Sequence, residues 1–131
     1  MGIRVLCIDD EPGIRALLRI SLQHTADAQV DVAGSSEEAL ALLQETEPPD
    51  LCVVDYSMSG MSGADFCRRL REDERYASVR VVFLTADAPA EGAEWYRAVG
   101  ASGCLAKPFS PFTIGRELLA FLGLPLVVEA A

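Results

Sequence analysis

The chain has 131 residues, of which 50% are hydrophobic and 24% are charged, and its formal net charge at pH 7 is −9. This length suits one globular domain, and no apolar run approaches the roughly 20 residues that a membrane-spanning helix needs, so we expect no membrane segment. The acidic balance argues against direct nucleic-acid binding, which requires clustered Lys and Arg side chains to displace counterions.

Strand-like and helix-like segments alternate five times along the chain. Apolar runs predict strands at residues 3–8, 29–33, 51–55, 79–84 and 103–106. Apolar residues at helical spacing predict five helices, which begin near Pro12, Ser35, Ser62, Pro89 and Ser110. The fourth helix should end at Gly100 and the fifth at Gly123. Residues 1–123 therefore form one domain, and residues 124–131 form a short tail that could begin a linker.

This alternation predicts an α/β fold, a doubly wound parallel sheet with helices on both faces. Right-handed crossovers restrict the strand order, and five-stranded sheets of this kind commonly run 2-1-3-4-5, the flavodoxin-like (βα)5 arrangement. In that order the first and third strands are neighbours at the point where the winding direction changes. Open sheets bind their ligands at this point, outside the carboxyl ends of the strands.

Polar side chains follow the carboxyl ends of four of these strands. Asp9 and Asp10 follow the first strand, Asp55 ends the third, and Thr85 and Lys107 follow the fourth and fifth. Taken alone, Asp55 could merely cap the next turn, as Asp often does. The convergence of five polar residues at one sheet edge favours a reactive or metal-binding carboxylate instead.

Three carboxylates in one crevice repel each other, and two like charges about 4 Å apart cost on the order of 4 kcal/mol at an effective dielectric of about 20. Either a raised pKa or a hard dication with oxygen ligands must offset this repulsion. Mg²⁺ suits such a site, with Mn²⁺ as the alternative. Carboxylate, metal, hydroxyl and lysine are together the parts needed to transfer a phosphoryl group to a carboxylate nucleophile.

In this order and spacing, the residues resemble the receiver domain of bacterial two-component response regulators over nearly the whole chain. The motifs that carry the resemblance are Asp9-Asp10, Asp55, Met58-x-x-Met61-x-Gly63, Thr85-Ala86, Gly100-Ala101-x-Gly103 and Lys107-Pro108-Phe109. The resemblance implies a phosphoacceptor signalling domain, in which Asp55 takes a phosphoryl group from a histidine kinase or phosphotransfer protein. Such a domain is not an enzyme with a separate substrate, because its chemistry is limited to its own phosphorylation and dephosphorylation.

The resemblance also implies how the site binds a metal and reaches a partner. Asp10 and Asp55, with the backbone carbonyl of Ser57, would bind the metal, and Asp9 would act through a bound water. Phosphorylation would reshape the face made by the fourth helix, fifth strand and fifth helix. That face would then act on a downstream protein or on a fused output domain.

Other residues would hold the phosphoryl group, transmit its arrival or tune its lifetime. The resemblance implies that Thr85 and Lys107 hold the phosphoryl oxygens. It also implies that Thr85 is one member of a pair of switch residues. The other member is usually an aromatic residue, but this chain has Cys104, which is too small to gate the pocket as Tyr or Phe would. Ser57 and Asp87 occupy positions that tune how fast the acyl phosphate hydrolyses.

Departures from the family leave two other functions open. Cys104, and Ser59 in a position where receivers usually have Pro, suggest a binding module that has kept the fold and lost the switch. A phosphatase with an aspartyl nucleophile needs similar parts, but such enzymes have Asp-x-Asp after the first strand and a cap domain. This chain has adjacent Asp9-Asp10 and no inserted cap.

The remaining chemistry-bearing residues have structural interpretations. The four cysteines lack any C-x-x-C spacing, which argues against zinc. The N-terminus lacks a signal-peptide pattern, so we expect a cytoplasmic protein, a compartment in which disulfides are rare. His24, the only histidine, is expected on the surface at the end of the first helix. Because Trp95 and Tyr96 are adjacent on a helix, we expect one of their rings to be exposed.

Overall fold

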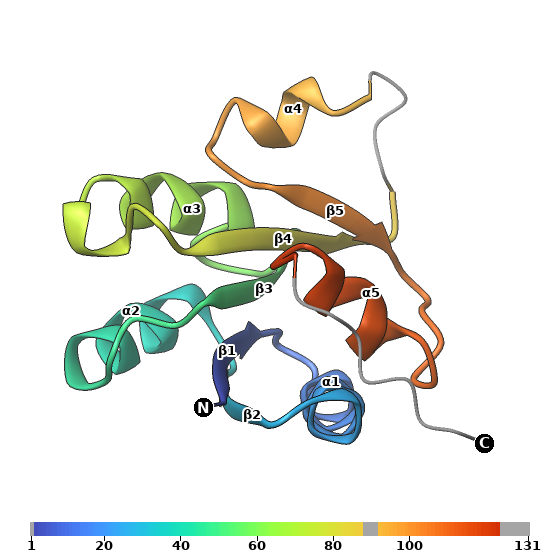
Figure 1. Ribbon diagram of the computed structural model, residues 1–131. Helices are drawn as coiled ribbons and strands as arrows, with labels where there is room; N and C mark the ends of the chain where they lie inside the picture. The colour runs from blue at the N-terminus through green and yellow to red at the C-terminus, as the bar shows by residue number, and fades with distance from the viewer. Residues whose placement is uncertain (1, 88–91, 124–131) are drawn as a thin grey trace.

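A parallel five-stranded sheet forms the centre of the structure, a computed structural model that describes residues 2–87 and 92–123 (Figure 1). The strands are Ile3–Ile8 (β1), Ala28–Ala33 (β2), Leu51–Asp55 (β3), Arg80–Thr85 (β4) and Gly103–Ala106 (β5). Their order is β2-β1-β3-β4-β5 with parallel pairing throughout, which confirms the predicted topology. The tail predicted over residues 124–131 lies outside the described residues.

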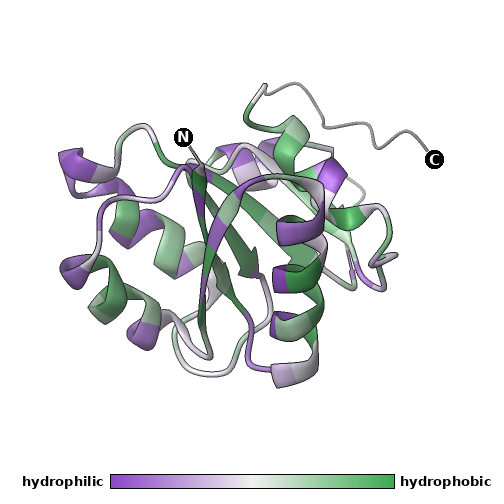
Figure 2. Ribbon diagram, turned by 60° about the horizontal axis from the view of Figure 1, so that its bottom comes forward, coloured by the Kyte–Doolittle hydropathy of each residue, from purple (hydrophilic) through white to green (hydrophobic). Residues whose placement is uncertain are grey.

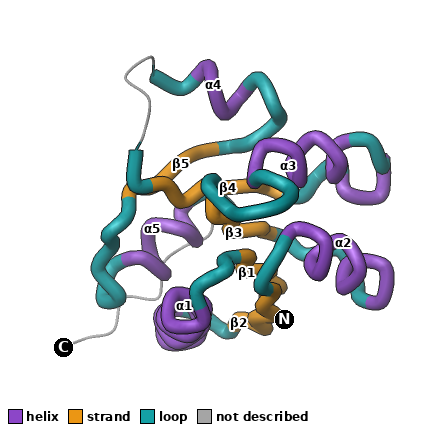
Figure 3. The backbone as a smooth tube through the Cα atoms, turned by 180° about the vertical axis from the view of Figure 1, so that it is seen from behind, coloured by secondary structure: helices purple, strands orange, loops and turns teal. Residues whose placement is uncertain are grey.

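Helices cover both faces of the sheet. They are Pro12–Thr25 (α1), Ser36–Glu45 (α2), Gly63–Arg71 (α3), Glu94–Arg97 (α4) and Ile114–Ala120 (α5), with a short 3-10 helix at Glu74–Tyr76. Helices α1 and α5 lie side by side on one face, and α2 and α3 lie on the other, as the views from the front and from behind both show (Figures 1 and 3). None of the described helices has both the length and the apolar character that crossing a bilayer requires.

Local sequence explains where the first three helices begin. Pro12 is the first residue of α1, where its missing N–H removes no helical hydrogen bond. Ser35 and Ser62 cap α2 and α3, because their hydroxyls accept hydrogen bonds from the N–H groups of Glu38 at 3.0 Å and Asp65 at 3.1 Å. Each cap of this kind contributes about 1 kcal/mol to stability.

Two helices are shorter than the sequence predicted. The α4 helix is limited to Glu94–Arg97 within the described residues, and its predicted start at Pro89 lies outside them. Gly92 has a φ of +80°, a left-handed conformation that cannot continue a right-handed helix. The α5 helix begins at Ile114 rather than near Ser110, and a turn precedes it in which the carbonyl of Ser110 accepts from the N–H groups of Thr113 at 3.2 Å and Ile114 at 2.9 Å.

The sheet divides the apolar core into two layers. One layer lies against α1 and α5, and the other lies against α2 and α3. Figure 2 shows largely hydrophobic strands between amphipathic helices. Cys7 belongs to the first layer and Cys52 to the second, so the two thiols lie on opposite faces of the sheet. Burial raises the pKa of Cys7 to about 12 and also raises that of Cys52. All four cysteines are free, and three of them are buried.

The close approach of α5 to α1 depends on a glycine. A Cβ atom on Gly115 would lie 2.5 Å from the backbone oxygen of Ser21, which is closer than real Cβ contacts occur. The N–H of Gly115 donates to the hydroxyl of Ser21 at 2.8 Å, so this buried serine has a partner in the opposite helix. The interface between the two helices is therefore fixed by the absence of a side chain.

We expect Gly115→Ala to lower the free energy of unfolding by about 1–3 kcal/mol, because the added methyl group must push the two helices apart. Gly13→Ala is the matched control, since a Cβ at this helical glycine would meet nothing within 4 Å. It should raise stability by up to about 1 kcal/mol through a lower entropy of the unfolded chain. Urea unfolding of both variants measures the difference, and equal stabilisation of both would contradict this account of the interface.

Candidate functional site

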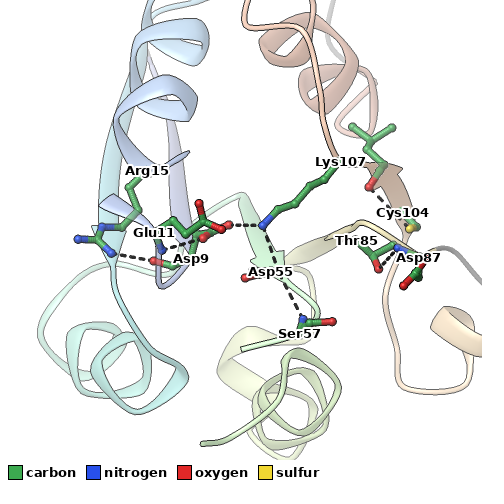
Figure 4. Close-up of polar contacts among 10 residues, drawn as sticks. Asp9, Glu11, Arg15, Asp55, Ser57, Thr85, Asp87, Cys104 and Lys107 are labelled. Carbon is green, nitrogen blue, oxygen red and sulfur yellow. Dashed lines mark hydrogen bonds and ion pairs between the residues drawn. The ribbon is translucent and has the colours of Figure 1, made fainter. Parts of the chain in front are cut away.

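The carboxyl ends of four strands bring the predicted site residues to one edge of the sheet (Figure 4). Asp9 and Asp10 follow β1, Asp55 ends β3, Thr85 ends β4 and Lys107 follows β5. The register pairs the last residues of β1 with those of β3, so their carboxylates leave neighbouring strands side by side. Thr85 is joined to the same edge through its backbone oxygen, which accepts from the N–H of Lys107 at 2.8 Å.

The ammonium group of Lys107 lies between two buried carboxylates. Its Nζ atom is 2.9 Å from Oδ2 of Asp9 and 3.4 Å from Oδ1 of Asp55 (Figure 4). Asp9 is fully buried, and only 5% of Asp55 is exposed. Burial lowers the pKa of Lys107, but the hydrogen bond to Asp9 and the charges of both carboxylates outweigh this effect and raise the pKa above its usual value. Lys107 is therefore a fixed positive charge at neutral pH.

Asp55 is electrostatically destabilised even with this lysine beside it. Burial raises the pKa of its carboxyl group, and the neighbouring charge of Asp9 raises it further. The charge of Lys107 and the N–H of Ser57, which donates to Oδ1 at 3.3 Å, act in the opposite direction without cancelling the shift. Lys107 alone does not neutralise the carboxylates of the site. A further positive charge near Asp55 would therefore stabilise its ionised form.

Asp9 is held at both its backbone and its side chain. Its Oδ1 atom accepts from the N–H of Glu11 at 2.9 Å, while Oδ2 accepts from Lys107. Its backbone oxygen accepts from Nη1 of Arg15 at 2.8 Å. Sequence reasoning missed Arg15, for which the only available signal was a basic residue one turn into α1, next to the acidic loop.

Three carboxylates at this edge could share a cation. One oxygen from each of Asp9, Asp10 and Asp55 lies within 4.8 Å of the others, and Asp10 is exposed to solvent. Carboxylate oxygens are the ligands that hard dications prefer, and Mg²⁺ usually takes one or two of them and keeps several waters. The donor set therefore fits Mg²⁺ better than a metal that prefers nitrogen or sulfur.

Comparison with known proteins decides where this site belongs. Residues 5–118 match the family described as the response regulator receiver domain. The chain belongs to this family. Response regulator Rre1 of Synechocystis is 38% identical over 90% of this chain and 52% of Rre1. The phosphate regulon transcriptional regulatory protein PhoB of Pseudomonas aeruginosa is 33% identical over 93% of this chain and 51% of PhoB. The chain spans about half the length of these curated relatives.

Solved receiver domains share the fold. The chemotaxis response regulator CheY4 of Vibrio cholerae superposes with a TM-score of 0.84 at 32% identity, covering 92% of this chain and 99% of that chain. This similarity confirms the flavodoxin-like arrangement that the sequence predicted. The chain is a receiver domain of the two-component response regulators, which confirms the signalling class inferred from its motifs.

The structure places the predicted switch and tuning residues of this receiver domain around the acidic site. Thr85 is buried, and its hydroxyl accepts from the N–H of Asp87 at 3.2 Å (Figure 4). Asp87 and Ser57 are exposed. Cys104 is half-buried on β5 and packs against the core layer formed with α2 and α3. Its thiol makes a long contact of 3.9 Å to the carbonyl of Leu105, and no described contact joins it to Thr85.

An aromatic cluster connects the residue after Asp55 to α4 of the receiver domain. The ring of Tyr56 packs edge-on against Trp95 and Phe83, with ring centroids 5.0 Å and 5.2 Å apart. Trp95 stacks on Phe83 with the two centroids 5.9 Å apart. Trp95 also meets Tyr96 edge-on at 5.5 Å. Both Trp95 and Tyr96 are half-buried, so neither residue is as exposed as expected and neither is fully buried. Because Trp95 and Tyr96 pack edge-on against each other, both rings can contact the same core layer.

We expect Asp55→Asn to stabilise the metal-free protein at neutral pH. The pKa of Asp55 is raised by folding, so its contribution to stability is fully present at acidic pH and is lost as the pH rises through the raised pKa. The advantage of the variant should therefore grow from acidic to neutral pH, to on the order of 1 kcal/mol.

Urea unfolding in the presence of EDTA at a series of pH values measures this advantage. Asp65→Asn, which removes an exposed carboxylate on α3, is the matched control and should bring no such gain. An advantage that stays constant with pH, or is absent, would show that burial and Asp9 do not destabilise the Asp55 carboxylate.

Proposed function

We propose that this receiver domain accepts a phosphoryl group on Asp55 from the phosphohistidine of a histidine kinase or phosphotransfer protein. The position of Lys107 carries this proposal, because its ammonium group touches both Asp9 and Asp55 at the end of neighbouring strands. A buried carboxylate beside a fixed cation and two further acids has the parts of a metal-assisted phosphoacceptor. A turn-capping aspartate would need none of these partners.

In the proposed transfer, an oxygen of Asp55 forms a bond to phosphorus while the bond between phosphorus and the donor imidazole nitrogen breaks. The released nitrogen keeps the electron pair and takes up a proton, and Asp55 becomes an acyl phosphate. Lys107 has three N–H donors, of which two face Asp9 and Asp55, so one is left for a phosphoryl oxygen. The hydroxyl of Thr85 accepts from Asp87 and so keeps its own hydrogen for a second phosphoryl oxygen.

A Mg²⁺ ion would be held by Asp10, Asp55 and the backbone carbonyl of Ser57, with Asp9 acting through a bound water. Mn²⁺ also prefers oxygen ligands and could replace it. When bound, the metal would supply the positive charge that the phosphoryl oxygens need during transfer. The raised pKa of Asp55, caused by burial and the charge of Asp9, and the proximity of the three carboxylates support this assignment.

Arrival of the phosphoryl group would be transmitted through the residues around it. A hydrogen bond from Thr85 to a phosphoryl oxygen would draw its side chain away from the N–H of Asp87 and so alter the loop after β4. The face of α4, β5 and α5 would then change its affinity for a downstream protein or a fused output domain. Ser57 and Asp87, exposed beside the site, would tune how fast water hydrolyses the acyl phosphate.

We expect acetyl phosphate with Mg²⁺ to add one phosphoryl group to the wild-type chain, as measured by intact-protein mass spectrometry. Asp55→Asn should gain none, because an amide is not a nucleophile that can form the acyl phosphate. The control Asp65→Asn should be phosphorylated as the wild type is, and EDTA should abolish the reaction. Phosphorylation of Asp55→Asn would overturn the assignment of the acceptor.

Trp95 is the only tryptophan of the chain, and its ring contacts Tyr56, the residue after Asp55. We therefore expect its fluorescence emission to change when acetyl phosphate and Mg²⁺ phosphorylate the wild type, and to stay constant in Asp55→Asn. The same measurement distinguishes a switching receiver from a binding module that has lost its switch. Cys104, in place of the usual aromatic residue, is the observation that favours the binding module. Complete phosphorylation with unchanged emission would favour the binding module.

A further inference from the structure

A buried serine of α2 holds the loop that follows Asp55. Ser36 is the first residue of α2 and is fully buried. Its hydroxyl donates to the backbone carbonyl of Met61 at 2.9 Å, across 25 positions of sequence. A hydroxyl without access to water needs such a partner, so this bond is a strong constraint on the position of the loop.

Two further contacts hold the loop of residues 56–62: the side chain of Met58 is buried in the core layer formed with α2 and α3, and a backbone hydrogen bond closes the base. The N–H of Gly63 donates to the carbonyl of Tyr56 at 3.3 Å, which closes the loop beside β3. Within the described part of the chain, the bond from Ser36 is the one side-chain hydrogen bond that reaches residues 58–61 from another element. It therefore holds the backbone at Met61, while Met58 is anchored by its buried side chain and the base is fixed by β3 and α3.

The turn in this loop has no stiffening residue of its own. Gly60 has a φ of +78°, the value that the third residue of a type II turn takes. Proline is common at the second position of such a turn because its ring fixes φ. That position holds Ser59, which is exposed and has no ring to fix its φ. The hydrogen bond from Ser36 to Met61 can supply rigidity that the turn sequence itself does not provide.

We infer that Ser36 is a positioning residue for the phosphoacceptor site, because its bond to Met61 fixes the loop that carries the carbonyl of Ser57. This inference rests on the proposed function, in which that carbonyl is a metal ligand. Ser36 touches neither metal nor phosphoryl group and acts only through the loop. Loss of its hydroxyl should let the loop sample conformations in which the carbonyl points away from the metal.

The test compares Mg²⁺ affinity, measured by titration calorimetry, among variants of two adjacent serines. Ser36→Ala should bind Mg²⁺ about tenfold more weakly than the wild type, the usual effect of removing a residue that orients a metal ligand. Ser36→Cys covers the case in which the alanine variant folds poorly, because cysteine has nearly the volume of serine. Its thiol is only a weak donor, so this variant should also bind Mg²⁺ more weakly than the wild type. Ser35→Ala is the matched control, because it removes the cap of α2 and leaves the bond to Met61 intact.

A second substitution separates a positioning role from a general effect on α2. Adding Ser59→Pro to Ser36→Ala should restore most of the Mg²⁺ affinity, because the proline ring fixes the turn from within. Amide hydrogen exchange gives a readout without metal: residues 57–61 should exchange faster in Ser36→Ala and return toward the wild-type rate in the double variant.

Several results would overturn the inference. Unchanged Mg²⁺ affinity in both Ser36 variants would do so, as would an equal loss in Ser35→Ala or a double variant that stays as weak as Ser36→Ala. Failure of the wild type itself to bind Mg²⁺ or to accept a phosphoryl group would instead overturn the proposed function. The wild-type measurement therefore distinguishes the two failures.

Discussion

Repulsion among carboxylates at one edge of the sheet governs this receiver domain. Asp9 and Asp55 are buried next to each other, and the structure tolerates them because Lys107 reaches between them from the opposite side of the site. Burial raises the pKa of Asp55, and the charge of Asp9 raises it further. A further positive charge near Asp55 would stabilise its ionised form, so a cation bound by the three carboxylates would also stabilise the fold.

The fold was largely predictable because its determinants are local or periodic. Strand β3 is buried at every residue, and its sequence is apolar up to Asp55, so both its place in the sheet and the acid at its end follow from the pattern. The caps at Ser35 and Ser62 are equally local. The convergence of distant polar residues then follows from the handedness of the crossovers. The sequence is therefore sufficient to bring five site residues to one sheet edge.

The features that the sequence did not reveal depend on contacts between distant segments. The burial of Trp95 depends on its contact with the ring of Tyr56, 39 positions away, and helical spacing carries no such information. The bond from Ser36 to Met61 is of the same kind, since a serine early in a helix is ordinarily interpreted as part of its cap. The short α4 follows from backbone angles at Gly92 that no propensity scale specifies.

The small size of α4 has a consequence for how much of the signal reaches a partner. None of its residues is fully buried, and its attachment relies on a few aromatic contacts at the rim of the core. A segment that buries little surface can be rearranged at little cost, because few favourable contacts are lost when it moves. Most of the free energy released by modifying Asp55 would then remain available for differential affinity between the two states, rather than being consumed inside the domain. If α4 lies on the face that contacts a partner, as proposed, its weak anchoring would leave more of this free energy for the change in affinity.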